Sequence, residues 1–257
     1  ALLESKELSH PRLEAVFTVD EETGMYGASS IDLSMLKGNR MLNIDSDEEG
    51  VFLTGCAGGL SLSACIPVSR VSQGGTKLII TVTGLTGGHS GSEIHKEHGN
   101  ANILMGRVLH GLLERTPFGI ISLAGGLKDN AIPRECTVEI LLPGENAKAA
   151  ATYIRDISSV FKHEFSETDA EVTVCCENQG EMEAAILDYA SVSKVIFYLR
   201  NVPNGVQHMS QQLNGQVETS LNLGILELTE SELTSLTSVR SSVESRKKDL
   251  AERITID

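Results

Sequence analysis

The clearest alternation of apolar and polar positions runs from residue 77 to residue 176. Two stretches place apolar residues three or four apart, as an amphipathic helix does; they are residues 102–115 and 147–165. Four shorter apolar runs are rich in Val, Ile and Leu, as strands are; they are residues 77–84, 119–124, 136–142 and 170–176. The resulting β-α-β-β-α-β order predicts a four-stranded antiparallel sheet with both helices on one face.

A similar but incomplete pattern follows toward the C-terminus. Its elements are a helical stretch, two strand-like runs and a charged helix, at residues 184–199, 216–228, 235–242 and 245–254. The two halves share no residue-level repeat, so the expected partial duplication depends on the order of elements alone. We therefore expect residues 67–180 to form a first half and residues 181–257 to form an incomplete second half.

Two apolar runs near the N-terminus each end in carboxylates. Residues 15–19 (AVFTV) lead toward Glu21 and Glu22, and residues 40–44 (RMLNI) lead into Asp45. We expect both runs to be buried strands of an α/β sheet, with their acids gathered at one edge. Carboxylates brought together in this way repel unless a cation neutralises them, so convergence would require a metal. The alternative at this point is a solvated acidic turn.

A stretch rich in Gly and Ser, residues 55–72, separates these runs from the regular pattern. We interpret it as the passage between two domains. Residues 1–66 then form part of an α/β domain, and residues 67–257 form a second domain of α+β type. The chain also begins without Met and with what resembles the last turns of an uncapped helix, so we expect a piece of a longer protein.

The net charge is strongly negative, at −14. Because phosphate binding requires clusters of Lys and Arg, this charge argues against nucleic acid or an anionic membrane as a partner. No apolar run approaches the ~18 residues of a membrane span, and no signal segment opens the chain, so a cytoplasmic location is expected. The five cysteines lack C-x-x-C spacing and are interpreted as small, buried apolar residues; they are Cys56, Cys65, Cys136, Cys175 and Cys176.

Residues 84–102 (GLTGGHSGSEIHKEHGNAN) hold the strongest candidate outside the acidic runs. The glycines around His89 let the backbone approach a ligand closely, although a surface turn is the alternative. Ser90 does not complete a nucleophile elbow, since G-x-S-x-G requires Gly where Ser92 stands. Arg240 lies in a strand-like run between small residues, where it either binds a carboxylate or faces solvent at a strand edge.

Several segments, taken together and in this order, resemble one family. They are HPRLEAVFTVDEETGMYGA, LNIDSDEEG, the loop around His89, GGLKDNAIPRE and ETSLNLGIL. The sequence is similar to the aminoacyl-histidine dipeptidase (Xaa-His dipeptidase, peptidase D) branch of the co-catalytic zinc aminopeptidase and carboxypeptidase family. The resemblance covers essentially the whole chain and implies a catalytic α/β domain with a two-zinc centre, interrupted by a lid or dimerisation domain. It also implies a lid of two similar halves, a dipeptide substrate and a homodimer formed through the lid.

The resemblance assigns a role to each candidate side chain. It implies that Glu21 is the general base, that Glu22 and Asp45 are zinc ligands, that His89 stabilises the oxyanion and that Arg240 holds the substrate carboxylate. The family also requires an H-x-D segment and a further histidine near the C-terminus, and this sequence has neither. We therefore expect two Zn²⁺ or other divalent ions in the longer parent enzyme, and a piece that is metal-free and inactive by itself.

Two other classes of function remain open at this stage. In the first, the lid fold is a self-association or binding module and the acidic segment is inert, since exposed edge strands favour pairing between chains. In the second, Ser90 serves a serine hydrolase. A serine-directed covalent probe that failed to label Ser90 would remove the second class.

Overall fold

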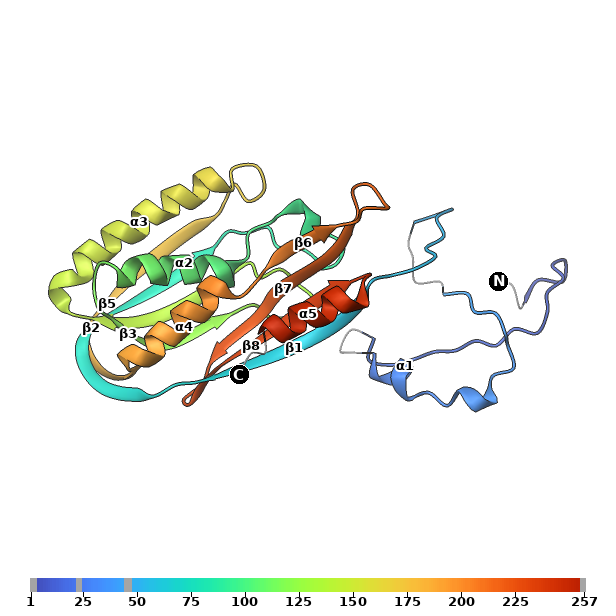
Figure 1. The fold of residues 1–257 in the computed structure, drawn as a ribbon, viewed down its shortest axis with the longest axis horizontal. Helices are drawn as coiled ribbons and strands as arrows, with labels where there is room; N and C mark the ends of the chain where they lie inside the picture. Colours follow the sequence, from blue (N-terminus) through green and yellow to red (C-terminus); the bar gives the residue numbers. More distant parts are fainter. Residues whose placement is uncertain (1–3, 22–24, 44–47, 255–257) are drawn as a thin grey trace. The chain divides into compact units, whose positions relative to one another are not determined.

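The computed structural model describes residues 4–21, 25–43 and 48–254. It divides into two units, residues 1–55 and residues 56–257. The second unit is built on an eight-stranded sheet, with its longer helices on one face (Figure 1). Every strand pair in this sheet is antiparallel, and the order is β1-β8-β7-β3-β4-β2-β5, with β6 paired to β7.

The first half of the second unit has the predicted β-α-β-β-α-β order. Its elements are β2 (Arg70–Thr83), α2 (Ala101–Leu113), β3 (Gly119–Gly125), β4 (Cys136–Leu142), α3 (Ala147–Glu164) and β5 (Thr173–Leu187). β2 lies between β4 and β5, and β4 lies between β2 and β3. This arrangement confirms the predicted fold, a mixed α/β chain with an antiparallel sheet covered by helices on one face.

The second half follows the same path, but its first strand comes from earlier in the chain. Its elements are β1 (Gly58–Pro67), α4 (Tyr189–Asn201), β6 (Gly205–Met209), β7 (Val217–Leu228), β8 (Glu232–Ser241) and α5 (Glu244–Ile254). β1 pairs with β8 and β8 with β7, as β2 pairs with β4 and β4 with β3. The equivalent strands β3 and β7 pair antiparallel, with Gly125 opposite Leu226, and so join the two halves into one sheet.

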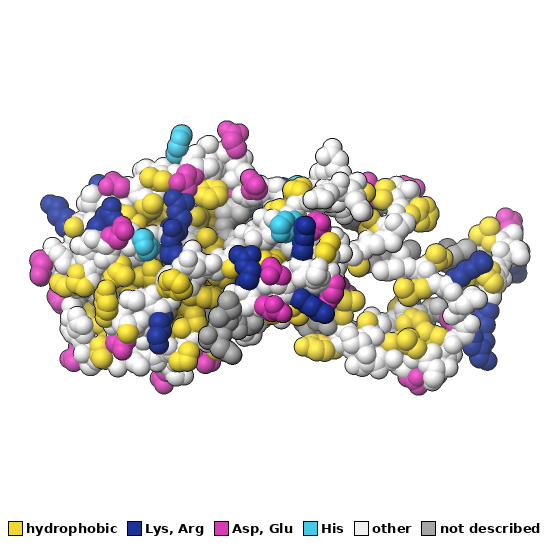
Figure 2. Space-filling view, viewed as in Figure 1, with side chains coloured by type: hydrophobic (Ala, Val, Ile, Leu, Met, Phe, Trp, Pro, Cys, Tyr) yellow, Lys and Arg dark blue, Asp and Glu magenta, His cyan; other side chains and the backbone are white. Residues whose placement is uncertain are grey.

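The unit formed by residues 1–55 differs from what its apolar pattern predicts. Its described helices are short: α1 (Tyr26–Ser30) and the 3-10 helix η2 (Leu33–Met35). The described residues of the runs at 15–19 and 40–44 carry no strand, and Phe17 is 91% exposed. The prediction of buried strands is therefore wrong here, because an apolar run becomes a strand only when a neighbouring strand takes up its backbone hydrogen bonds. Hydrophobic side chains of this unit reach the surface instead (Figure 2).

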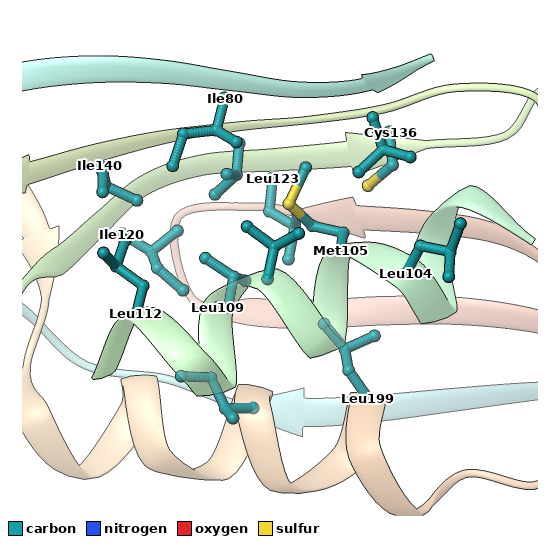
Figure 3. Packing of buried hydrophobic residues seen from close by; sticks show 14 of the residues in the cluster. Ile80, Leu104, Met105, Leu109, Leu112, Ile120, Leu123, Cys136, Ile140 and Leu199 are labelled. Carbon is teal, nitrogen blue, oxygen red and sulfur yellow. The ribbon is translucent and has the colours of Figure 1, made fainter. Parts of the chain in front are cut away.

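The core of the second unit is centred on α2, which packs on the sheet with one side and on α4 with the other. The predicted apolar face is buried, with Leu104, Val108, Leu109 and Leu112 at most 4% exposed. Figure 3 shows this face toward the strands, while Leu199 of α4 approaches α2 from the other side. None of the helices in the described parts of the chain is long and apolar enough to cross a membrane.

The boundary between β5 and α4 differs from the predicted helix at residues 184–199. Residues 184–187 continue β5, and the helix begins at Tyr189. Asp188 sets this start because its side chain accepts a hydrogen bond from Ser191 N at 2.7 Å, which caps the first turn. The apolar residues before Asp188 belong to β5. The predicted helix therefore began too early, because it included the last residues of this strand.

The stretch rich in Gly and Ser is not a simple connection. Most of residues 58–72 lie in β1 and at the start of β2, and β1 pairs with β8 along its whole length. Sequence reasoning missed β1 because its first residues are glycines, which are depleted in strands. It also missed the short strand β6. The domain boundary expected at residues 66 and 67 stays a prediction.

The cysteines differ in exposure, and all five are free. Cys136 is buried, and burial raises the pKa of its thiol. The prediction of burial is wrong for three of the others; they are Cys56, Cys65 and Cys175. Cys175 and Cys176 point to opposite faces of β5, so only Cys176 turns toward the helices and is half-buried.

Candidate functional site

Two loops of the first half lie side by side and carry the candidate site. Residues 84–100 connect β2 to α2, and residues 126–135 connect β3 to β4. His89 in the first loop forms an antiparallel bridge with Ala131 in the second. The flanking backbone bonds run from Ser90 N to Asn130 O and from Ile132 N to Gly88 O, each at 2.8 Å. The backbone is therefore fixed on both sides of His89.

Asn222 of β7 holds the second loop against the other half of the sheet. Its Nδ2 donates to Ala131 O at 2.8 Å and to Asp129 O at 3.1 Å. The carboxylate of Asp129 also accepts a bond from the hydroxyl of Ser61 in β1, at 3.0 Å. Because Asn222 is 1% exposed, water competes little for these bonds. The second half of the sheet thus sets the position of a loop that belongs to the first half.

Arg240 of β8 lies next to the His89 loop. In the β7–β8 register, Ser238 is opposite Asn222, so Arg240, two residues on, shares the face that Asn222 occupies. A Cβ atom added at Gly91 would lie 3.0 Å from His89 Cε1 and 3.1 Å from Arg240 Nε. The structure therefore brings the side chains of His89 and Arg240 together beside Gly91, although they come from different halves.

Two polar groups at this point have no partner among the described residues. The Nε of Arg240 and the Oγ of Ser90 are both buried, and neither makes a hydrogen bond there. Buried polar groups in folded proteins are nearly always paired, with protein, water or ligand. A guanidinium binds carboxylates and phosphates in particular. The arrangement is suited to a ligand that brings acceptor oxygens.

The ring of His89 is held by its own loop, and the side chain is exposed. Its Nδ1 accepts hydrogen bonds from Gly91 N at 3.2 Å and Ser92 N at 3.1 Å. The backbone N–H of His89 donates to Glu93 Oε2 at 2.8 Å, and Glu93 Oε1 pairs with Lys96 at 2.7 Å. The hydrogen bond from Lys96, followed by that from His89 N–H, lowers the pKa of Glu93 to about 2. Glu93 is thus ionised wherever histidines titrate.

Asp169 ties together the two ends of the same loop. Its Oδ1 accepts a bond from Thr86 N at 2.7 Å and its Oδ2 accepts one from Gly99 N at 2.9 Å. The residue is 1% exposed. Burial by itself disfavours the charged carboxylate, but hydrogen bonds from the N–H groups of Gly99 and Thr86, together with those from the side chains of Thr168 and Thr86, outweigh it and lower the pKa of Asp169. The loop that presents His89 therefore closes on one buried carboxylate.

Sequence reasoning missed the buried asparagines that support the site. Asn100 caps α2 with its Oδ1, which accepts from the backbone at the start of the helix. Its Nδ2 donates to Asn222 Oδ1 at 3.1 Å, to Leu223 O at 3.1 Å and to Asn204 Oδ1 at 3.3 Å. The only signal in the sequence was a polar residue before an amphipathic helix, which predicts a cap and nothing about β7.

The predicted acidic residues are placed only in part. Glu21 is exposed, whereas Glu22 and Asp45 lie outside the described residues, so their convergence stays a prediction. Within the ranges that the structure describes, no three His, Cys, Asp or Glu side chains are grouped so that they could hold a metal ion. The roles expected for these three carboxylates are taken up below as a proposal.

The chain is similar to a protein family, to a characterised enzyme and to a solved structure. Residues 80–169 match the family described as Peptidase dimerisation domain. The chain is 33% identical over 249 residues to the cytosol non-specific dipeptidase of Escherichia coli (strain K12), which covers 96% of this chain and 51% of that protein. The crystal structure of aminoacylhistidine dipeptidase from Vibrio alginolyticus superposes with a TM-score of 0.82 and 35% identity, over 98% of this chain and 52% of the other.

Both comparisons reach nearly every residue of the chain, and the chain spans about half the length of each relative. The resemblance found in the sequence is confirmed, because an independent fold comparison and a family match lead to the same group of proteins. Residues 80–169 thus match a peptidase dimerisation domain, and the chain is similar, along almost its whole length, to the dipeptidases that include aminoacylhistidine dipeptidase.

Proposed function

We propose that the chain is part of a longer dipeptidase, in which the second unit forms a lid over the substrate. The observation that carries this proposal is the proximity of His89 and Arg240 beside Gly91; His89 is exposed, and the buried Nε of Arg240 has no hydrogen-bond partner among the described residues. The two dipeptidase relatives support it. We also place the protein in the cytosol, as the name of the Escherichia coli relative does for that protein.

Three residues of this chain have separate roles in the proposed hydrolysis of an aminoacyl-histidine-type dipeptide. Arg240 binds the terminal carboxylate, which supplies the acceptor oxygens that its Nε lacks. His89 donates a hydrogen bond to the oxygen of the scissile carbonyl as negative charge develops there. Glu21 accepts a proton from the attacking water and passes it to the leaving amine.

The metal centre implied by the resemblance needs more ligands than the two carboxylates assigned to it in this sequence. Two Zn²⁺ or other divalent ions would supply a water that is acidic enough to attack near neutral pH. Glu22 and Asp45 are the ligands that we assign here. A zinc site is about four-coordinate, so two carboxylates leave two such ions incompletely held, and the described residues add no further group. We therefore propose that this chain alone is metal-free and inactive.

Elemental analysis tests the metal proposal directly. The 257-residue chain, purified after growth with zinc and dialysed without chelator, is expected to carry zinc far below one ion per chain and to hydrolyse no dipeptide. The whole protein, treated in the same way, is the positive control and should retain zinc and activity. Tightly bound zinc near one ion per chain in the shorter protein would contradict the proposal.

Arg240→Met in the whole protein tests the site that carries the proposal. Wild-type enzyme should prefer a dipeptide with a free carboxylate over the same dipeptide as its amide, because only the carboxylate pairs with the guanidinium. The variant should lose about 30-fold of that preference in kcat/KM, as expected for one hydrogen-bonded charge pair. Arg155→Met is the matched control, since Arg155 is exposed on α3. An unchanged preference in Arg240→Met would overturn the assignment.

A second candidate function is self-association through the lid, favoured by the match of residues 80–169 to a peptidase dimerisation domain. We propose a homodimer of the whole protein. Sedimentation over a range of dilutions measures it, alongside the dipeptidase assay. A concentration-dependent dimer without peptidase activity in the whole protein would leave only the binding-module function.

A further inference from the structure

The turn around His89 is built like the capped start of a helix, with the imidazole in the place of the capping side chain. The N–H groups of Gly91 and Ser92 both point at His89 Nδ1, and Glu93 N donates to His89 O at 3.0 Å. The side chain of Glu93 reaches back to accept a hydrogen bond from His89 N, as the acidic residue of a capping box does at the N-cap.

Gly88 makes room for this return contact. A Cβ atom at residue 88 would lie 2.8 Å from Glu93 Oε2, and Gly88 has φ +133, which residues other than glycine rarely adopt. The carboxylate of Glu93 therefore occupies the space that a side chain at residue 88 would fill.

The bonds at Nδ1 decide which ring nitrogen carries the proton. A backbone N–H can only donate, so a nitrogen that faces two of them has to be an unprotonated acceptor. The hydroxyl of Ser92, 3.3 Å from Nδ1, can donate to the same atom. In the neutral imidazole the proton then lies on Nε2, the nitrogen for which no bond within the described residues is found. That nitrogen is the one available to a ligand.

We propose that Glu93 is a positioning residue: together with the Gly91 and Ser92 amides it holds His89 as the Nε2–H tautomer before any substrate binds. This inference rests on the proposed role of His89, since a hydrogen-bond donor is what a developing oxyanion requires. A ring fixed in advance does not have to change tautomer or turn over during the reaction. The backbone N–H groups of Gly91 and Ser92 hold the imidazole in this position.

Long-range ¹H–¹⁵N spectra of the labelled 257-residue chain test the proposal without substrate or metal. At a pH about two units above the ordinary histidine pKa, His89 is expected to show only the Nε2–H pattern. His95, an exposed histidine in the same loop with no ring bond to the described residues, reports the ordinary mixture of tautomers. A native His89 with the proton on Nδ1, or with the mixture that His95 shows, would overturn the proposal.

Three variants assign the effect to Glu93. Glu93→Ala should move the His89 pattern toward that of His95 and speed amide exchange at His89 roughly tenfold, through loss of one charge-assisted hydrogen bond. Glu93→Gln keeps an oxygen acceptor for His89 N and should retain the native pattern. Lys96→Ala, which removes only the ion pair to Oε1, is the control and should also retain it.

The role of Glu93 would be overturned if the His89 tautomer pattern were unchanged in Glu93→Ala. It would also be overturned if Glu93→Gln altered that pattern as much as Glu93→Ala does. The native spectrum remains a test even if a variant fails to fold. Absence of dipeptidase activity in the whole protein would instead overturn the proposed function, because the ring pattern is measured on the free chain. The two failures are therefore distinguishable.

Discussion

Replacing Arg70 by Met is expected to lower the free energy of unfolding of the chain by about 3 kcal/mol. The guanidinium of Arg70 donates to four backbone carbonyls: Nη1 to Ile121 O at 2.9 Å and Ala185 O at 3.2 Å, Nε to Glu230 O at 3.1 Å, and Nη2 to Thr229 O at 2.9 Å. These carbonyls belong to β3, to β5 and to the turn between β7 and β8. Met keeps the apolar stem but leaves all four carbonyls without their donor.

Urea unfolding of the two proteins measures this loss, and Arg155→Met is again the matched control. Arg155 is exposed on α3, so its removal should change stability by less than about 0.5 kcal/mol. Because Arg70 joins the first half of the sheet to the far turn of the second, the variant should also speed amide exchange in β8. A loss no larger than that of the control would show that water replaces the guanidinium at little cost.

The elements that the sequence predicted well are those whose packing is local. Helix α2 was expected at residues 102–115 and runs from Ala101 to Leu113, because its apolar period and its partners on the neighbouring strands agree. Helix α3 was expected at residues 147–165 and differs by one residue. Each of these helices carries its signal within its own residues.

The strands that were missed or wrongly predicted depend on distant partners. Residues 15–19 have the composition of a buried strand, yet the described chain gives them none to pair with. β1 has the composition of a linker, yet it is a strand because β8, more than 160 residues later, pairs with all of it. Composition cannot distinguish these two cases, since a strand is completed by its neighbour.

The same limit applies to the site. The residue types and the family resemblance identified His89 and Arg240, but their proximity follows from the pairing of β3 with β7 and from Asn222, which no local pattern contains. Glu93 and Asp169 were missed because acidic residues in polar loops are usually solvated. Only the folded loop shows which of its carboxylates accept backbone N–H groups.

Asp169→Ala is expected to be the most damaging change near the site, lowering the free energy of unfolding by about 3 to 4 kcal/mol at neutral pH. The substitution leaves the N–H groups of Thr86 and Gly99 without their acceptor, and that of Gly99 is buried. Asp169→Asn should do almost as much harm, because an amide has one acceptor oxygen and would turn its NH₂ group toward the second N–H. Urea unfolding of both variants tests this.

The pH dependence of the same loss separates a charged anchor from simple packing. The pKa of Asp169 is lower in the folded chain than its ordinary value, so its contribution to stability is fully present above about pH 4 and is lost as the pH falls through the folded pKa. The difference in stability between wild type and Asp169→Ala should therefore shrink in acid. Asp156→Ala removes an exposed carboxylate on α3, so the difference in stability between wild type and this variant should not shrink in acid. If the difference for Asp169→Ala stayed constant with pH, the loop would depend on the volume of this side chain, and its charge would not be what closes the turn that presents His89.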